Sequence, residues 1–299
     1  MRSLQGILWL TLIFLSGSCL RLDDNLYNLS DKISQYKFDD YTGEQDFVLD
    51  DSYKIQDSMR HLFTLDSRDN DGKTFQIYAL YLGDLARIKT DTVILYCHGN
   101  KWHMDFYWQR AKLMAHTGGK HRYGVLMLDY RGYGLSDDPT SEEGLYTDVN
   151  TCLEWLRLQG LSNDRLVIYG FSMGSAPATK LTSEPRSMVP SRLILEAPFG
   201  SADVMAADAA GLNMPGSFVT SLKINNADLI KKVTQPFFWM HGIGDNFLSI
   251  QTHGEVVFKN YGGTKRKAIR VPEADHGEVP EKMGFDTYLR ELGQFISGK

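Results

Sequence analysis

The apolar residues of this chain fall into short runs, and most of the stretches between them have the spacing of amphipathic helices. The apolar, β-rich runs predict strands at 61–65, 74–82, 92–97, 124–128, 166–169, 193–195, 236–240 and 268–271. Helical spacing predicts helices at 106–116, 142–158, 176–181 and 285–296. Short apolar strands that alternate with helices predict an α/β fold with a mostly parallel central sheet and helices on both faces.

The N-terminal sequence is typical of a targeting segment that is not part of the folded domain. An apolar run at residues 6–15 is shorter than the roughly 20 residues that span a bilayer, and predicts a signal peptide over 1–18. The small residues before Cys19 resemble a bacterial lipobox, although Leu15 lies four positions before the cysteine instead of three. We expect export and a lipid anchor on Cys19 in the bacterial cell envelope. Secretion, to the periplasm or beyond, and an uncleaved anchor are the alternatives.

Two further segments lack the regular alternation. Residues 19–55 are polar and acidic, and predict a tether and N-terminal lead-in to a domain over 56–299. Residues 201–233 contain apolar side chains interrupted by glycine and proline, with no strand pattern. Their place between two predicted strands suits a small cap over the catalytic face, and an ordinary pair of connecting helices is the alternative.

Charge and cysteine content exclude several function classes. The 299 residues have a net charge of −5 and no long basic run, so we expect no nucleic-acid partner. Cys97 and Cys152 lie in apolar patterns and are interpreted as core residues. No Cys/His spacing typical of a metal site occurs, and we expect neither a metal nor another cofactor. The oligomeric state does not follow from the sequence.

The sequence Gly170-Phe171-Ser172-Met173-Gly174 follows the predicted strand at 166–169 and precedes a helix-forming stretch. Glycines on both sides let the chain turn sharply from strand to helix, which exposes the serine hydroxyl at the end of a sheet. This context predicts that Ser172 is a nucleophile, whereas the five-residue motif alone would also fit an idle serine in a glycine-rich turn.

A serine hydroxyl needs a base to activate it and an acid to orient the base. His276 falls between the last predicted strand and the last helix, and is the candidate base. Asp245 follows the strand at 236–240 and is the candidate acid. Glu196, at the end of the preceding strand, is the competing acid, although its context before Ala-Pro-Phe suggests a structural carboxylate. The order Ser, Asp, His fits the hydrolase arrangement.

An oxyanion hole needs two backbone N–H groups that point at one position. We expect one from Met173, directly after the nucleophile, and one from Asn100, in the loop after the strand at 92–97. His98 and His241 each end a strand before a glycine, and are expected to shape loops through hydrogen bonds.

The chain from about residue 75 to its end resembles the α/β-hydrolase superfamily. The resemblance rests on six motifs: His98-Gly99-Asn100, Asp129-Tyr130-Arg131-Gly132-Tyr133-Gly134, Gly170-Phe171-Ser172-Met173-Gly174-Ser175, Glu196-Ala197-Pro198-Phe199, His241-Gly242 with Asp245, and Asp275-His276. The combination is similar to the bud-emergence-protein-like branch, which includes eukaryotic acyl-protein depalmitoylases, a thioesterase class. The resemblance implies the same three catalytic residues. The chain departs from that branch at Lys101-Trp102-His103, where smaller residues are usual.

These observations predict a serine hydrolase that cleaves a carboxylic ester or thioester through an acyl-enzyme. The expected substrate is a small-molecule or lipid-like acyl ester. An acyltransferase or a peptidase would use the same three residues, and a catalytically idle binding module is the non-enzymatic alternative.

Overall fold

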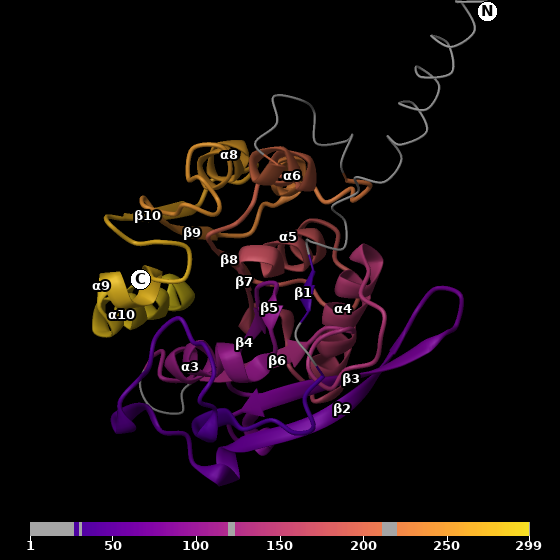
Figure 1. The fold of residues 1–299 in the computed structure, drawn as a ribbon. Coiled ribbons are helices and arrows are strands. Elements are labelled where there is room, and N and C mark those ends of the chain that lie inside the picture. Colours follow the sequence, from indigo (N-terminus) through magenta and orange to yellow (C-terminus); the bar gives the residue numbers. More distant parts are fainter. Residues whose placement is uncertain (1–26, 30–31, 119–122, 211–219, 299) are drawn as a thin grey trace, which may run out of the picture.

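The computed structural model describes residues 27–29, 32–118, 123–210 and 220–298 (Figure 1). The predicted signal peptide at 1–18 and the lipidation site Cys19 lie outside the described residues. Among the residues described, no helix is both long enough and apolar enough to cross a membrane.

An eight-stranded sheet forms the centre of the described structure, with the strand order β10-β9-β8-β7-β4-β6-β3-β2. At one edge, β2 pairs antiparallel with β3, and β3 pairs antiparallel with β6. The other neighbouring strands are parallel. The strands are β2 (Arg60–Arg68), β3 (Thr74–Leu82), β4 (Thr92–Cys97), β6 (Tyr123–Asp129), β7 (Leu166–Phe171), β8 (Arg192–Glu196), β9 (Phe237–Gly242) and β10 (Arg266–Val271). The predicted fold class, with its mostly parallel sheet, is confirmed.

Helices cover both faces of this sheet. One face carries α3 (Met104–Ala115), α9 (Val279–Met283) and α10 (Phe285–Ser297) (Figure 1). The other carries α4 (Glu142–Leu158), α5 (Ser175–Ser183) and α8 (Gly254–Asn260). The described residues also contain short 3-10 turns: η1 (Phe38–Asp40), η2 (Asp51–Tyr53), η3 (Asp57–Met59), η4 (Leu85–Arg87), η5 (Asn163–Arg165), η6 (Ser172–Gly174) and η8 (Ile230–Lys232).

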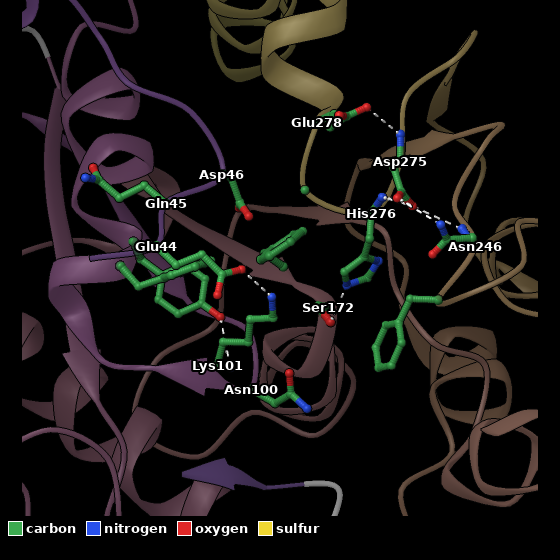
Figure 2. A pocket seen from close by; sticks show the side chains of 15 residues that line it. Glu44, Gln45, Asp46, Asn100, Lys101, Ser172, Asn246, Asp275, His276 and Glu278 are labelled. Atoms are coloured by element: carbon green, nitrogen blue, oxygen red, sulfur yellow. Dashed lines mark hydrogen bonds and ion pairs between the residues drawn. The ribbon is translucent and has the colours of Figure 1, made fainter. Parts of the chain in front are cut away.

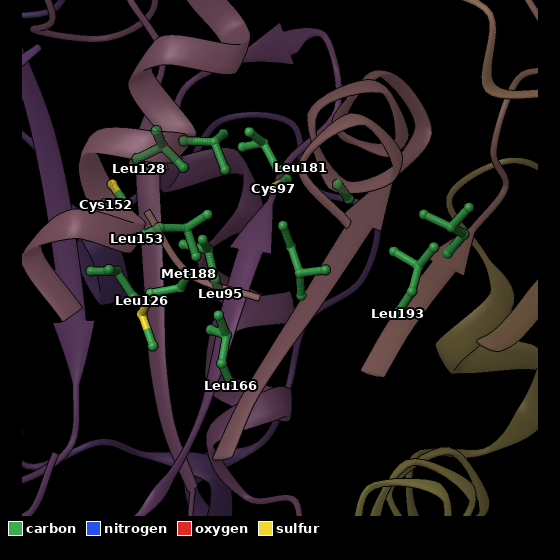
Figure 3. Close-up of a cluster of buried hydrophobic side chains, with 14 of the residues drawn as sticks. Leu95, Cys97, Leu126, Leu128, Cys152, Leu153, Leu166, Leu181, Met188 and Leu193 are labelled. Atoms are coloured by element: carbon green, nitrogen blue, oxygen red, sulfur yellow. The ribbon is translucent and has the colours of Figure 1, made fainter. Parts of the chain in front are cut away.

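Strand side chains alternate between two buried clusters, one on each face of the sheet. In β4, Leu95 and Cys97 join the cluster under α4 and α5, whereas Ile94 and Tyr96 join the cluster under α3. This period of two explains why the central strands read as continuous apolar runs. Cys97 and Cys152 are both buried and unbonded, and lie in the first of these clusters (Figure 3).

The described part of the lead-in packs against the domain. Strand β1 (Asn28–Leu29) pairs in parallel with β5 (Lys101–Trp102), the bulky sequence noted above. The backbone N–H groups of Lys37 and Phe38 donate to the carboxylate of Asp105 in α3. These contacts bring residues 44–46 to the edge of the candidate site.

The segment 201–233 contains two helices, α6 (Ala202–Ala210) and α7 (Asn226–Leu229), while 211–219 lie outside the described residues. An isolated bridge between Ser201 and Asn225 joins its two ends. Asn226 donates to the hydroxyl of Ser175 in α5, which fixes the base of this segment beside the helix that follows the predicted nucleophile. A cap function for this segment stays a prediction.

Candidate active site

Ser172 lies on a sharp turn between β7 and α5, with a left-handed backbone φ of 51°. The flanking glycines are required by close backbone contacts. A Cβ on Gly170 would lie 2.5 Å from the carbonyl oxygen of Gly174, and one on Gly174 would lie 2.0 Å from the carbonyl oxygen of Cys97. The strained turn therefore exists only because both positions lack side chains.

Replacing Gly174 with alanine is expected to lower the free energy of unfolding by about 2 kcal/mol or more, since rigid backbone must move to admit the methyl group. Urea denaturation measures this change. Gly293→Ala is the matched control, because its Cβ would meet no atom closer than 3.7 Å and the residue lies within helix α10. Equal stability of Gly174→Ala and wild type would contradict the proposed backbone constraint.

Three predicted residues, Ser172, His276 and Asp245, meet at the end of the sheet, and Figure 2 shows the first two of them. The Nε2 atom of His276 lies 2.8 Å from the Oγ atom of Ser172, and its Nδ1 atom lies 2.7 Å from Oδ2 of Asp245. Ser172 is 4% exposed and the His276 side chain 20% exposed, so the histidine borders solvent while the serine lies deeper. This arrangement can pass the serine proton to His276 while Asp245 stabilises the resulting imidazolium.

Asp245 is held by four hydrogen-bond donors. Its Oδ1 accepts from the backbone N–H groups of Phe247 and Leu248, at 3.0 and 2.7 Å. Its Oδ2 lies near Nδ1 of His276 and also 3.1 Å from Nε2 of the buried His241. Burial by itself would raise the pKa of Asp245, but the hydrogen bonds from His241 and His276 outweigh it and hold this pKa well below its ordinary value.

The lowered pKa of Asp245 predicts a loss of stability in acid. The pKa of Asp245 is lower in the folded state than in the unfolded state. The stabilisation of the fold by ionised Asp245 is therefore fully present above the ordinary pKa of about 4. It is lost as the pH falls toward the lower folded-state pKa. Urea denaturation at pH 7 and pH 3.5 measures the effect, and Asp245→Asn should lose less stability between these two pH values than wild type. An equal loss in both proteins would contradict the assigned cause.

A cavity of about 540 Å³ opens above Ser172. Its wall includes Asn100, one of the two predicted oxyanion-hole residues, whereas the side chain of Met173 is buried in the core on the far side of the turn. The lining consists of Glu44, Gln45, Asp46, Asn100, Lys101, Phe106, Tyr107, Phe171, Ser172, Asn246, Phe247, Asp275, His276, Gly277 and Glu278 (Figure 2). Its size suits a small organic ligand.

Three other residues singled out in the sequence, His98, Glu196 and His241, contact buried polar groups of neighbouring segments. The Nε2 atom of His98 lies 3.1 Å from Oδ1 of Asp129, and both side chains are fully buried. Glu196, the competing acid, is also fully buried and bonds to Arg110 instead of His276. His241 likewise contacts the carbonyl oxygen of Leu248 at 2.9 Å, in addition to Asp245.

Two groups of site residues were missed from the sequence. His241 contacts the same carboxylate oxygen as the candidate base, and its spacing of four residues before Asp245 could have indicated this. Residues 44–46 form part of the cavity wall, although their acidic, aperiodic surroundings carry no such signal. Their place depends on contacts with α3 and β5 that are distant in sequence.

Comparisons with known proteins agree with this fold. The family described as alpha/beta hydrolase fold matches residues 92–220. An alpha/beta hydrolase domain-containing protein 17B of Homo sapiens is 28% identical over 209 residues, which cover 68% of this chain and 66% of the relative. The alpha/beta hydrolase domain-containing protein WAV2 of Arabidopsis thaliana is 30% identical over 187 residues, which cover 57% of each chain. The match thus spans less than two thirds of the length of either relative.

Solved structures show the same architecture. An esterase of Pyrococcus furiosus superposes with a TM-score of 0.62 at 18% identity, over 81% of this chain and 92% of the esterase. An esterase of Exiguobacterium antarcticum gives a TM-score of 0.58 at 18% identity, over 79% and 100%. The sheet, the turn at Ser172 and these likenesses define an α/β-hydrolase fold. The chain therefore has the α/β-hydrolase fold that its motifs predicted, and it is similar in sequence to members of the α/β-hydrolase superfamily. The finer branch assignment stays a prediction.

Proposed function

We propose that this protein is a serine hydrolase that cleaves a carboxylic ester or thioester through an acyl-enzyme. The observation that carries the proposal is the hydrogen-bond chain from Ser172 through His276 to Asp245 at the base of an open cavity. Esterases among the structural neighbours share the fold, which makes the chemistry familiar for this architecture without specifying a substrate.

In the proposed reaction, Nε2 of His276 takes the Ser172 proton as Oγ attacks the carbonyl carbon of the substrate. The backbone N–H groups of Asn100 and Met173 stabilise the oxyanion of the tetrahedral intermediate. His276 then gives its proton to the leaving oxygen or sulfur, which leaves an ester on Ser172. Water, deprotonated by the same histidine, releases the acid and restores the serine. Asp245 stays ionised throughout.

The cavity supports a small-molecule or lipid-like acyl ester as substrate. The cavity wall around Ser172 includes aromatic side chains, which suit an acyl chain. These are Phe106, Tyr107, Phe171 and Phe247. The proposed steps use only side chains and backbone groups of this chain, and need neither a metal ion nor an organic cofactor.

Pre-steady-state kinetics with p-nitrophenyl acetate and p-nitrophenyl octanoate tests the acyl-enzyme. If deacylation is slower than acylation, we expect a burst of about one p-nitrophenol per chain, followed by slower turnover. Added alcohols or amines that capture the acyl group more readily than water would favour the acyltransferase alternative, and cleavage of acyl amides would favour a peptidase. No turnover of any of these substrates by folded protein would contradict the proposal.

We further propose that the protein is exported and lipid-anchored at Cys19, on the basis of its N-terminal sequence. Mass spectrometry of the protein from the membrane fraction of an expressing bacterium would reveal a lipidated N-terminal Cys19 peptide. Cys19→Ser should move the protein out of that fraction. An unmodified N-terminus beginning at Met1 would contradict the assignment.

A further inference from the structure

Arg110 is a buried cation at the centre of helix α3, only 2% exposed. Each of its three guanidinium nitrogens donates to a different segment of the chain. Nη1 lies 2.6 Å from Oε1 of Glu196, Nε lies 2.9 Å from Oδ2 of Asp46, and Nη2 lies 2.6 Å from the carbonyl oxygen of Gly277. A planar guanidinium can hold three acceptors in fixed directions, which a lysine ammonium on its flexible stem does not.

One of these hydrogen bonds, together with a contact to an aromatic ring, lies next to the proposed catalytic residues. Gly277 directly follows His276, so the bond to its carbonyl oxygen restrains the loop that carries the base. The guanidinium carbon also lies 4.0 Å from the ring centroid of Phe171, the residue before Ser172. The Phe171 ring in turn lies 5.3 Å from the His276 ring, centroid to centroid. Arg110 therefore contacts the chain on both sides of the Ser172–His276 hydrogen bond.

One carboxylate partner of the Arg110 guanidinium, Asp46, belongs to the N-terminal lead-in. Asp46 carries an 18% exposed side chain and packs directly on the His276 loop, because a Cβ on Gly277 would lie 2.4 Å from its Oδ1. The other carboxylate partner, Glu196, also accepts hydrogen bonds on its Oε2 atom from the buried hydroxyl groups of Tyr169 and Tyr288. With two carboxylates around one guanidinium, removing Asp46 leaves the buried Arg110–Glu196 pair intact, so the fold does not depend on Asp46 for charge balance.

We propose that Arg110 is a positioning residue for His276 and that Asp46 of the lead-in locks it, so that the docked lead-in completes the active site. The inference rests on the proposed function for its effect on activity. The bond from Arg110 to Gly277 holds the base at hydrogen-bond distance from Ser172, and the contact from Asp46 keeps the guanidinium in that direction. A segment that resembles a polar tether in the sequence thus becomes part of the catalytic geometry.

Asp46→Ala in the full-length protein tests the proposal. We expect kcat toward p-nitrophenyl acetate to fall about 10-fold with little change in KM, because small misplacements of catalytic groups cost one to two orders of magnitude in rate. Asp46→Asn keeps an oxygen acceptor for Nε and should restore most of the rate. Arg110→Lys keeps the charge opposite Glu196 but loses the planar group that bonds to three acceptors at once. It should lower kcat about 100-fold, the cost of displacing a catalytic group by roughly 1 Å. Asp51→Ala is the matched control, since its side chain is 97% exposed on the same segment.

Hydrogen–deuterium exchange of the peptide 272–279 gives a readout that does not depend on activity. The proposal predicts faster exchange of this loop in Asp46→Ala than in wild type or Asp51→Ala, at equal free energies of unfolding. Wild-type loop exchange and a kcat within twofold of wild type in Asp46→Ala would overturn it. Faster loop exchange in a protein whose wild type hydrolyses no ester would support the positioning contact and count against the proposed function instead.

Discussion

Replacing Ser172 with alanine is expected to lower kcat for ester hydrolysis by about 10⁶-fold, the loss seen when a serine nucleophile is removed from such a triad. The methyl group cannot form the acyl-enzyme, and His276 loses the Oγ atom 2.8 Å from its Nε2. The fold should be unchanged, because alanine removes one oxygen without changing the Cβ position. Steady-state hydrolysis of p-nitrophenyl acetate measures the loss, and the urea midpoint checks the fold.

Ser297→Ala is the matched control for this experiment, since that serine lies on the exposed end of helix α10 and its hydroxyl donates to the backbone carbonyl oxygen of Gln294 in the same helix. It should retain wild-type kcat. Turnover by Ser172→Ala at more than about a hundredth of the wild-type rate would mean that another residue attacks the substrate, and the proposed mechanism would be wrong.

Asp245→Asn is expected to lower kcat by about 10⁴-fold through the wrong histidine tautomer. The backbone N–H groups of Phe247 and Leu248 both donate to Oδ1, so they hold the amide oxygen of asparagine at that position. The amide NH₂ then faces Nδ1 of His276 in place of the accepting Oδ2. To accept from it, His276 must carry its proton on Nε2, where it points at Ser172 and cannot take the serine proton.

The pH dependence of kcat/KM for wild type and Asp245→Asn distinguishes this cause from simple unfolding. A tautomer effect persists at every pH at which the variant is folded. Asp164→Asn is the control, because that side chain is 77% exposed at a turn far from the cavity lining. Activity of Asp245→Asn within tenfold of wild type would assign the orienting role to another group, with Glu196 the first to test.

The main strands and helices could be predicted from the sequence because each has its own local spacing of apolar residues. Apolar runs such as 92–97 are buried on both faces of the sheet, and the helix at 142–158 has the same bounds in the structure. The short helices α8 and α9 were missed, because five to seven residues are too few to show a helical period. Helix α6 fell within a segment for which the sequence left two interpretations open.

The candidate triad followed from chain order, because the superfamily topology brings the ends of β7, β9 and β10 to one edge of the sheet. The contact between Asp46 and Arg110 could not be predicted in this way, since it joins residues 64 positions apart and produces no periodic pattern in the sequence. Every residue of α3 is buried, so the charge of Arg110 needs partners from elsewhere in the chain, and this burial is known only from the structure.

Labelling of the purified protein with a fluorophosphonate probe, followed by mass spectrometry of the modified peptide, tests the central claim most directly. The account predicts one adduct per chain, on Ser172, which is absent in Ser172→Ala and strongly slowed in His276→Ala. A folded protein that forms no adduct, or that reacts at another serine, would contradict the assignment of Ser172 as an activated nucleophile.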